Sequence, residues 1–381
     1  MRYRNLGNTG FHVSEIGLGC EYLEGKGRKI VEDVIHASMD NGINILDCFM
    51  SEPDVRSNIG YALKGRRDKI HIQGHFRSIW ENGQYGRTMD LAKTKCFFED
   101  LLRRLNTDYI DFGMIHIVDN PADYEQIFSG EIFEYASELK RAGVVRKIGI
   151  STHNPATALL VAKSGNIDMM LLSINPAYDV LHETAARPKK LGNGFFDTVP
   201  MHGINGVRQE LYNYCASNGI GITAMKTLAA GALLNENTTP YARAMTVQQC
   251  IHYALTRPGV ASALVGMQSI EQVQDCLRYE EMSEQELDYS SIFAQEPRFN
   301  MEGRCMYCNH CLPCSAKINI AEVNKYLDMA MLEGIPLDSV RAHYESLEHT
   351  ADDCRQCGQC EKRCPFHVPI MERMRKAKEL F

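Results

Sequence analysis

Eight short apolar runs alternate with amphipathic helical patterns over about 270 residues of this chain. The runs are VSEIGLG, INILDCF, KIHIQGHF, YIDFGMIHI, RKIGIST, DMMLLSIN, GIGITAM and SALVGM. Strands buried on both faces read as continuous apolar segments, and helices between them indicate right-handed parallel crossovers. Eight such units predict a closed (β/α)8 TIM barrel rather than an open doubly wound sheet. No GxGxxG motif follows an early strand, which argues against a Rossmann fold.

The alternation stops near residue 281, so we expect two domains, 1–281 and 282–381. The second contains helical patterns and two cysteine runs, and it has too few apolar residues for a large core of its own. Bound metal clusters would supply the missing stability. Within the barrel, the irregular segment 181–205 follows the sixth strand, where loops form the active-site rim. It is a candidate substrate cap or a plain surface insertion.

Charge and hydropathy exclude several classes of partner. The net charge is −7 over 381 residues, and no dense block of Lys or Arg occurs. Nucleic acid and anionic membrane surfaces are therefore not expected partners. No apolar run reaches the roughly 20 residues of a membrane span. The N-terminus lacks the pattern of a signal peptide, so the protein is expected to be cytoplasmic.

Eight of the 14 cysteines form two runs in the second domain. One run is CMYCNHCLPC, and the other is CRQCGQCEKRCP, whose spacing matches the CxxCxxCxxxCP pattern of bacterial ferredoxins. Two 4Fe-4S clusters are the favoured interpretation, and structural zinc is the alternative. The remaining cysteines are scattered singly and are expected to be small buried apolar residues: Cys20, Cys48, Cys96, Cys215, Cys250 and Cys276.

The fourth cysteine of such a run commonly serves the other cluster. This rule predicts two crossed ligand sets, one of Cys305, Cys308, Cys311 and Cys364, and one of Cys314, Cys354, Cys357 and Cys360. Two clusters close together serve as a one-electron relay. They imply an external electron carrier of the ferredoxin or flavodoxin type and an acceptor site elsewhere in the chain.

Six segments of the barrel resemble the aldo/keto reductase family. They are MRYRNLGNTGFHVSEIGLG, GINILD, IGYALKGRRDKI, DYIDFGMIHI, GVVRKIGIST and GIGITAMK. The resemblance runs from residue 1 to about residue 280, and the cysteine domain resembles the ferredoxin-like extension of one branch. It implies a β/α barrel in which Asp, Tyr, Lys and His reduce a carbonyl with a nicotinamide hydride.

Only half of that tetrad is present at the matching positions. Asp47 matches the Asp and His116 matches the His, but Glu52 stands where the Tyr is expected and His75 where the Lys is expected. Two carboxylates and two imidazoles at one rim suit proton transfer near neutral pH. They also suit a mononuclear iron, manganese or zinc ion. A barrel that has lost its chemistry is the third interpretation.

The positions that would hold a nicotinamide cofactor are also mixed. The resemblance places Ser151 and Thr152 at the carboxamide, Gly266 near a phosphate, and Gln268 where a basic residue would hold the 2′-phosphate of NADPH. Lys226, at the end of the seventh strand, either reaches a cofactor phosphate or is a plain rim charge. Ordinary NADPH-dependent carbonyl reduction is therefore doubtful. NAD(H), a flavin and no diffusible hydride carrier all stay open.

The sequence favours an iron–sulfur oxidoreductase acting on a small molecule. In this hypothesis a two-cluster ferredoxin-like domain relays electrons to or from a barrel site that carries Asp47, Glu52, His75 and His116. It predicts that His75→Ala and Glu52→Ala abolish turnover without loss of the clusters. The alternatives are a non-catalytic electron-transfer or redox-sensing partner, and a metal-dependent lyase or isomerase whose clusters are structural.

Overall fold

A closed barrel of eight parallel strands forms the larger part of the molecule, as the alternating pattern predicts. The structure is a computed structural model, which describes residues 1–179, 206–293, 303, 305, 309–331, 337–364 and 366–381. Around the barrel the strand order is β3, β4, β5, β8, β9, β10, β11, β12. Their bounds are Ile16–Gly19, Ile45–Cys48, His71–Phe76, Ile110–Ile115, Val145–Thr152, Met169–Ser173, Gly221–Met225 and Val260–Val265.

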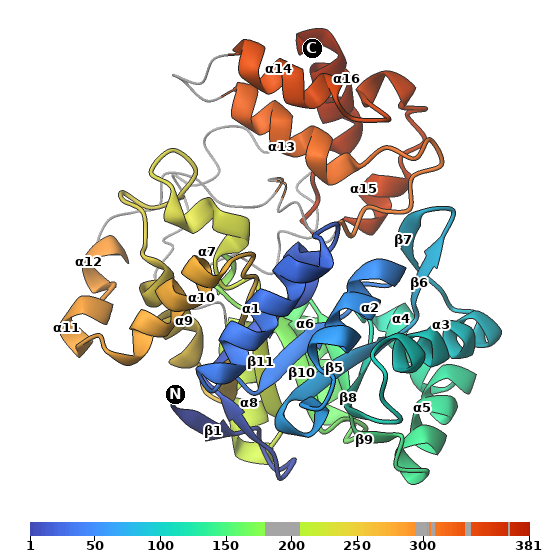
Figure 1. Cartoon of the computed structure of the whole chain (residues 1–381), viewed down its shortest axis with the longest axis vertical. Coiled ribbons are helices and arrows are strands. Elements are labelled where there is room, and N and C mark those ends of the chain that lie inside the picture. Colours follow the sequence, from blue (N-terminus) through green and yellow to red (C-terminus); the bar gives the residue numbers. More distant parts are fainter. Residues whose placement is uncertain (180–205, 294–302, 304, 306–308, 332–336, 365) are drawn as a thin grey trace.

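Helices surround the barrel (Figure 1). The helices between or after the strands are α1 Arg28–Asp40, α2 Pro53–Ala62, α3 Leu91–Arg104, α4 Pro121–Phe128, α5 Glu131–Arg141, α6 Pro155–Lys163, α7 Pro176–Asp179, α8 Gly206–Asn218, α9 Val247–Leu255 and α10 Ile270–Leu277. Their apolar faces and the outer faces of the strands form one continuous core. This is the burial that a barrel requires, since each strand is covered on both sides.

An N-terminal hairpin closes one end of the barrel. Its strands are β1 Tyr3–Asn5 and β2 His12–Ser14. Leu6 and Val13 are completely buried, and they join a separate core inside the barrel with Phe112, Met114 and Leu171. Because apolar side chains fill this end, only the opposite end, at the carboxyl ends of the strands, is available for a site.

A second hairpin leaves the barrel directly after β5. It consists of β6 Ser78–Glu81 and β7 Gln84–Arg87, which pair antiparallel across a two-residue turn at Asn82 and Gly83. Both turn residues have positive φ, 57° and 75°. Asn-Gly is the preferred dipeptide for this turn because both residues tolerate that conformation. The hairpin therefore extends strand five beyond the barrel rim.

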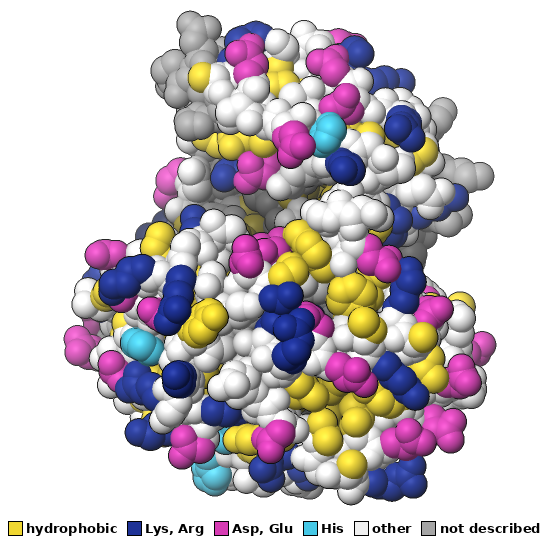
Figure 2. Space-filling model, turned by 45° about the vertical axis from the view of Figure 1, so that its right-hand side comes forward, with side chains coloured by type: hydrophobic (Ala, Val, Ile, Leu, Met, Phe, Trp, Pro, Cys, Tyr) yellow, Lys and Arg dark blue, Asp and Glu magenta, His cyan; other side chains and the backbone are white. Residues whose placement is uncertain are grey.

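The C-terminal region is helical and covers the open end of the barrel. Its helices are α11 Glu284–Leu287, α12 Ser290–Phe293, α13 Ile320–Ala330, α14 Leu337–Glu345, α15 Gln359–Arg363 and α16 Ile370–Leu380. Helices α13 to α16 stand together at one end of the molecule (Figure 1). On the face shown in Figure 2, basic and acidic side chains are interspersed over both parts.

The C-terminal helices do not rely on a core of their own alone. Buried Leu327, Val368 and Met374 belong to the same apolar cluster as Tyr85 of the hairpin and Leu233 of the barrel rim. Leu287 packs instead with the main barrel core. The predicted boundary at residue 281 thus falls before the last segment that packs on the barrel, and the two parts share a continuous apolar interface.

The scattered cysteines follow the expectation with one exception. Cys96 on α3 is exposed, whereas the other five are buried. Cys96 lies on the outer face of an amphipathic helix, whose buried positions are Thr94, Phe98 and Leu101. The candidate cap at 181–205 lies outside the described residues. Among those residues, no helix is long and apolar enough to cross a membrane.

Candidate active site

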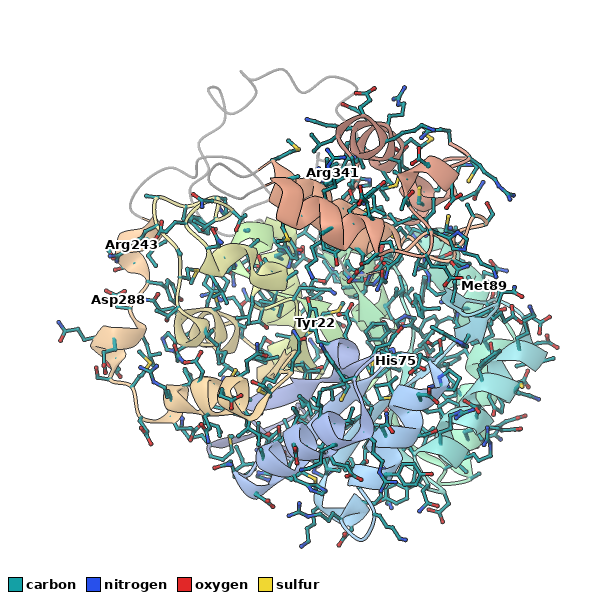
Figure 3. All side chains as sticks on the ribbon, turned by 45° about the horizontal axis from the view of Figure 1, so that its top comes forward. Tyr22, His75, Met89, Arg243, Asp288 and Arg341 are labelled. Carbon is teal, nitrogen blue, oxygen red and sulfur yellow. The ribbon has the colours of Figure 1, made fainter. Side chains whose placement is uncertain are left out.

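Three of the four predicted site residues meet at the carboxyl ends of neighbouring strands. Asp47 and His75 lie on β4 and β5, and His116 directly follows β8. Gln73 pairs in register with Asp47 and precedes His75 by two residues, so Gln73 and His75 face the same side of β5. The side chains of Asp47, Gln73, His75 and His116 are all buried. His75 lies near the centre of the molecule, below the C-terminal helices (Figure 3).

These residues form one chain of hydrogen bonds. Asp47 Oδ1 accepts from Gln73 Nε2 and faces His75 Nε2, both at 2.8 Å. His75 Nδ1 lies 2.8 Å from His116 Nδ1. His116 Nε2 lies 2.5 Å from the hydroxyl oxygen of Tyr85. The chain thus runs from a carboxylate through two imidazoles to a phenol.

The chemistry of the first member fixes the direction of donation. An ionised carboxylate only accepts, so His75 donates from Nε2 to Asp47. When His75 is neutral, its Nδ1 must accept from His116 Nδ1, and His116 Nε2 then accepts from Tyr85. When His75 carries a second proton, every bond beyond it reverses. The network therefore has two self-consistent states: in the second, His75 carries one more proton and His116 holds its proton at Nε2 instead of Nδ1.

His116 is held neutral by its surroundings. Burial lowers its pKa well below the ordinary value, and the nearby cationic charges of His75, His310, Arg87 and Arg77 lower it further. Phe49 stacks on its ring with centroids 5.4 Å apart. A neutral imidazole donates at one nitrogen and accepts at the other, as a proton relay requires.

Tyr85 was not a predicted site residue. It comes from the β6–β7 hairpin, 38 positions after Asp47 in the sequence. The signal that could have found the hairpin is the Asn82-Gly83 turn between alternating residues. Even so, the sequence cannot show that the hairpin folds over the barrel rim and directs Tyr85 toward His116.

Hydrogen bonds fasten the hairpin at its base. Arg77 donates from Nη1 to the carbonyl oxygen of His116 at 2.8 Å. Ser78 donates to the carbonyl oxygen of Phe49, and Ser51 donates to that of Ile79, both at 2.5 Å. The hairpin is therefore tied to the strand ends that carry Asp47 and His116, which limits how far Tyr85 can move.

Glu52 is not brought into this cluster. Its carboxylate caps the N-terminus of α2, where it accepts from the backbone amides of Asp54 and Val55 at 3.0 and 2.5 Å. Glu52 also does not line the cavity that Asp47, His75 and His116 face. Because Pro53 is the first helical residue, residue 52 occupies the helix-cap position. The Glu52 side chain therefore bonds to the helix and not to the other predicted site residues.

A cavity of about 1020 Å³ lies between the barrel mouth and the C-terminal region. Its barrel wall includes the site residues with Phe49, Trp80 and Tyr85. Its opposite wall includes His310, Leu312 and other residues up to Lys325 of α13. Its lining mixes aromatic and apolar side chains with many polar and charged ones, and a cavity of this size can hold a small molecule.

Four of the five predicted cofactor residues line this cavity, and Thr152 does not. Ser151 accepts from the amide of Ile117 at 2.9 Å. Thr152 donates to Asp119 at 3.0 Å and is completely buried, so its role is internal. Lys226 forms an ion pair with Glu21 at 3.2 Å, which offsets the charge that would hold a phosphate.

Gly266 and Gln268 line the cavity just after β12, at the carboxyl end of that strand. A Cβ atom at Gly266 would lie 2.3 Å from the ring of Tyr22, so glycine is needed for this contact. The backbone amide of Gln268 donates to Oε1 of Gln272 at 2.8 Å. Asp275 also lines this end. Amide and carboxylate groups there suit the hydroxyls of a ribose and disfavour a phosphate.

Four cysteines of the C-terminal region line a separate cavity of about 450 Å³: Cys314, Cys354, Cys357 and Cys360. They are the four residues of the crossed ligand set that the spacing predicts. Arg363 and Gln356 also face this cavity. Gln356 Nε2 donates to the sulfur of Cys354 at 3.4 Å.

Of the other predicted set, Cys308 lies outside the described residues. Arg363 joins the two runs, because it donates from Nε to the carbonyl oxygen of Cys311 at 3.1 Å and from Nη2 to that of Pro313 at 2.6 Å. Burial raises the pKa of Cys364, and the backbone amides of Val368, Phe366 and His367 partly offset this rise. Backbone amides directed at a cysteine sulfur are also found around iron–sulfur clusters.

No three His, Cys, Asp or Glu side chains within the described ranges converge closely enough to hold a single metal ion. At the barrel rim the reason is that Asp47, His75 and His116 bond to one another and Glu52 caps a helix. The four cysteines around the smaller cavity are spread wider than the ligands of a single tetrahedral zinc ion.

A family model described as the aldo/keto reductase family matches residues 15–246. This chain belongs to the aldo/keto reductase family. It is 26% identical over 292 residues to an uncharacterized oxidoreductase, YqkF, of Bacillus subtilis, covering 72% of this chain and 90% of that protein. It is 24% identical over 304 residues to L-galactose dehydrogenase of Arabidopsis thaliana, covering 71% of this chain and 86% of that protein.

Solved structures of the family have the same barrel. An aldo-keto reductase of Bacillus halodurans in its holo form aligns with a TM-score of 0.59 and 25% identity, covering 79% of this chain and 98% of that one. An aldo-keto reductase assigned to Pseudomonas aeruginosa aligns with a TM-score of 0.56 and 21% identity over 73% of this chain and 95% of that one. The second likeness concerns the fold alone. The family supports an oxidoreductase acting on a small molecule.

Proposed function

We propose that this protein is an iron–sulfur oxidoreductase that reduces or oxidises a small molecule in the barrel cavity. The C-terminal region would hold two 4Fe-4S clusters, which exchange electrons with an external carrier of the ferredoxin or flavodoxin type. The observation that carries this proposal is the smaller cavity. Cysteines from two runs 40 residues apart, Cys314 and Cys354, line it together with Cys357 and Cys360.

These residues fit a cluster better than the alternatives. Four cysteines line one cavity, a side-chain amide already donates to one sulfur, and Arg363 lines the same cavity, where its charge would offset that of a cluster. When bound, the clusters supply single electrons at low potential. Cys305, Cys308, Cys311 and Cys364 would hold the second cluster.

The hydrogen-bonded chain supplies the proton in this proposal. Tyr85 would give its hydroxyl proton to the developing oxyanion of the substrate. His116 would then return a proton from Nε2 to the Tyr85 oxygen while it takes one at Nδ1 from His75. The net change is one proton moved from the His75–Asp47 pair to the substrate, and no charge is left on His116.

The positions of the chain's own groups favour this path. Tyr85 lines the cavity together with Asp47, His75 and His116, and two imidazoles separate its hydroxyl from Asp47 in the hydrogen-bonded chain. Phe49 covers the ring of His116 and excludes water from one face. In this scheme Asp47, His75, His116 and Tyr85 act together, and Glu52 only positions α2.

A bound nicotinamide is a second source of electrons that the cavity permits. The hydroxyl oxygen of Ser151 lies 3.2 Å from Nδ1 of His116, and Gly266 and Gln268 line the same cavity at the carboxyl end of β12. The neutral and acidic groups there, with Lys226 paired to Glu21, favour NAD(H) over NADPH. A flavin is the other candidate for the same space.

Anaerobic purification followed by iron and sulfide analysis tests the proposal. The expected protein is brown, contains about eight irons and eight sulfides, and loses its visible absorbance with dithionite. Cys357→Ser should remove one cluster, whereas the matched control Cys96→Ser, on the exposed face of α3, should keep both. Colourless protein that contains only zinc would refute the proposal.

A further inference from the structure

The two predicted cysteine sets differ in how close they lie to solvent. Cys357, of the set around the smaller cavity, is exposed, and the other three cysteines of that set are partly exposed. Cys311, of the other set, is buried between His310 and Leu312, which are also buried and line the larger cavity. The ring of His310 packs against His153 of the barrel with centroids 4.5 Å apart. The first set therefore lies nearer to the surface, and Cys311 lies beside the barrel cavity.

Basic side chains dominate the charged lining of the smaller cavity. Lys317, Arg355 and Arg363 line it. Among the described residues of this lining, the one acidic residue is Glu81, which is paired with Lys93 at 2.9 Å. The whole chain has a net charge of −7, so an excess of positive charge at this opening is a local feature.

Two of these three cations face solvent. Lys317 and Arg355 are exposed, whereas Arg363 is half-buried. Arg363 donates to two main-chain carbonyl oxygens of the first cysteine run, so it joins the two runs. Lys317 and Arg355 are therefore the cations at this opening that can meet a partner protein.

This charge pattern fits a partner with acidic side chains around its own redox centre. Opposite charges steer two proteins into encounter and raise the association rate constant about 10- to 10³-fold at low ionic strength. Complexes for electron transfer bury little surface and are weak, so charge rather than a large apolar interface brings the partners together. A basic carrier would be repelled from the same opening.

We propose that the opening of the smaller cavity, with Lys317, Arg355 and Cys357 at its edge, is the docking surface for an acidic one-electron carrier protein. This inference rests on the proposed function and deepens it. It assigns the set around the smaller cavity to exchange with the carrier, and the set of Cys311 to exchange with the barrel cavity. Each encounter transfers one electron: in the reducing direction the carrier loses it and the cluster gains it, and no bond is made or broken.

Calorimetric binding measures docking without turnover. The probe is an oxidised 2Fe–2S ferredoxin with an acidic surface, and cytochrome c, a basic one-electron carrier, is the comparison. Both are titrated into the anaerobically purified protein at low ionic strength and at about 0.5 M salt, where screening removes long-range attraction. We expect the ferredoxin to bind at low ionic strength and at least about tenfold more weakly at high salt. Cytochrome c should not bind.

Charge reversal at the opening sharpens the test. Arg355→Glu combined with Lys317→Glu should weaken ferredoxin binding about tenfold or more at low ionic strength and remove most of its salt dependence. Each single variant should show part of this loss. The matched control is Lys64→Glu combined with Lys69→Glu, which changes the net charge equally. Both control residues are exposed and lie between α2 and β5, at the amino end of that strand, so binding should be retained.

Two further measurements separate docking from an effect on the clusters. The reduction potential of each variant should stay close to that of the wild type. Stopped-flow mixing with reduced ferredoxin should show cluster reduction slowed in parallel with the weaker binding. A shifted potential with unchanged affinity would mean that the two cations tune the clusters, and it would overturn the docking surface.

Three other results would overturn the docking surface. They are equal binding of both carriers, no binding of the ferredoxin at low ionic strength, and unchanged affinity in the charge-reversed variants. Iron analysis of the same samples distinguishes this failure from that of the proposed function. A protein with about eight irons that does not discriminate between the carriers keeps the relay and loses this surface. Absent iron overturns the relay itself.

Discussion

Two segments at the barrel mouth, the loop after β4 and the hairpin after β5, differ in which of them contributes a side chain to the hydrogen-bonded chain. The loop after β4 holds Glu52 where the family resemblance places a tyrosine, but Glu52 caps α2 and is not among the residues that line the cavity. The hairpin after β5 has no counterpart in the resemblance, yet it places Tyr85 2.5 Å from Nε2 of His116. A phenol thus stands beside the histidine, on a different element.

The difference shows that a residue belongs to the site only if its side chain reaches the cavity, whatever its position in the sequence. Proline at position 53 fixes residue 52 as a helix cap, which leaves no freedom for it to reach the cavity. The hairpin has no such restriction, since it extends beyond the rim and can fold back. The following predictions test how far the two segments differ.

The largest effect is expected from Tyr85→Phe. Loss of a general acid should lower turnover by about 10² to 10⁴-fold, because the phenyl ring keeps the packing but cannot transfer a proton. A viologen-linked assay on a small carbonyl compound that the wild type reduces measures this. Tyr124→Phe, on α4 and not among the residues that line the cavity, is the matched control and should retain activity. Normal turnover in Tyr85→Phe would contradict the role of Tyr85 as the general acid and would make Glu52 the candidate for that role again.

Glu24 lines the cavity and interacts electrostatically with Glu52, and its protonation should make the stability of the protein depend on pH. Burial, with the charges of Glu52 and Glu21, raises the pKa of Glu24 from 4.5 to about 7. The folded state therefore binds more protons than the unfolded state between these values. This stabilising contribution is complete below about pH 4.5 and is lost as the pH rises through 7.

Glu24→Gln should consequently stabilise the protein above pH 7 and not below pH 4.5. The gain at pH 8 is at most about 3 kcal/mol, and less because water partly screens the carboxylate. Melting temperatures of variant and wild type at pH 5 and pH 8 give the comparison. Glu99→Gln, on the exposed face of α3, should show no such pH dependence. A gain of equal size at both pH values would contradict the raised pKa.

Gln84→Leu tests the support of the hairpin by the C-terminal region. Gln84 accepts from the amide of Cys314 at 2.9 Å and donates to its carbonyl oxygen at 3.1 Å. Removal of both bonds should cost about 1–2 kcal/mol and should speed hydrogen exchange in residues 78–87. Gln209→Leu, on the exposed side of α8, is the control. Unchanged exchange in the hairpin would mean that its base alone holds Tyr85.

Glu52→Ala should have the smallest effect. Loss of the helix cap is expected to cost about 1 kcal/mol of stability. Turnover should change less than about threefold, since Glu52 does not face the cavity. Thermal unfolding and the viologen-linked assay measure the two effects. A loss of activity as large as that of Tyr85→Phe would return Glu52 to the catalytic group that the sequence suggested.

The barrel could be predicted from the sequence because its determinants are local. Each apolar run contains enough consecutive apolar residues to specify a buried strand. Each amphipathic pattern specifies the helix that covers the strand. The resemblance to the family singled out Asp47, His75 and His116, and the barrel explains why they meet, because the ends of parallel strands lie at one end of a barrel. The cysteine sets also follow from spacing, and Cys314 lines one cavity with Cys354, Cys357 and Cys360 as expected.

The sequence by itself therefore determined the barrel and the end that carries the site, the family resemblance added the three strand-end residues, and the cysteine spacing predicts two ligand sets of which the members of one line a common cavity. Only the tertiary structure decided that Tyr85 joins His116, that Glu52 caps a helix, and that His153 meets His310. Those contacts join segments separated by 31, 2 or 3, and 157 residues. The long-range contacts depend on how whole elements fold over the barrel mouth. The helix cap depends on a local choice between two environments, which residue type alone does not specify.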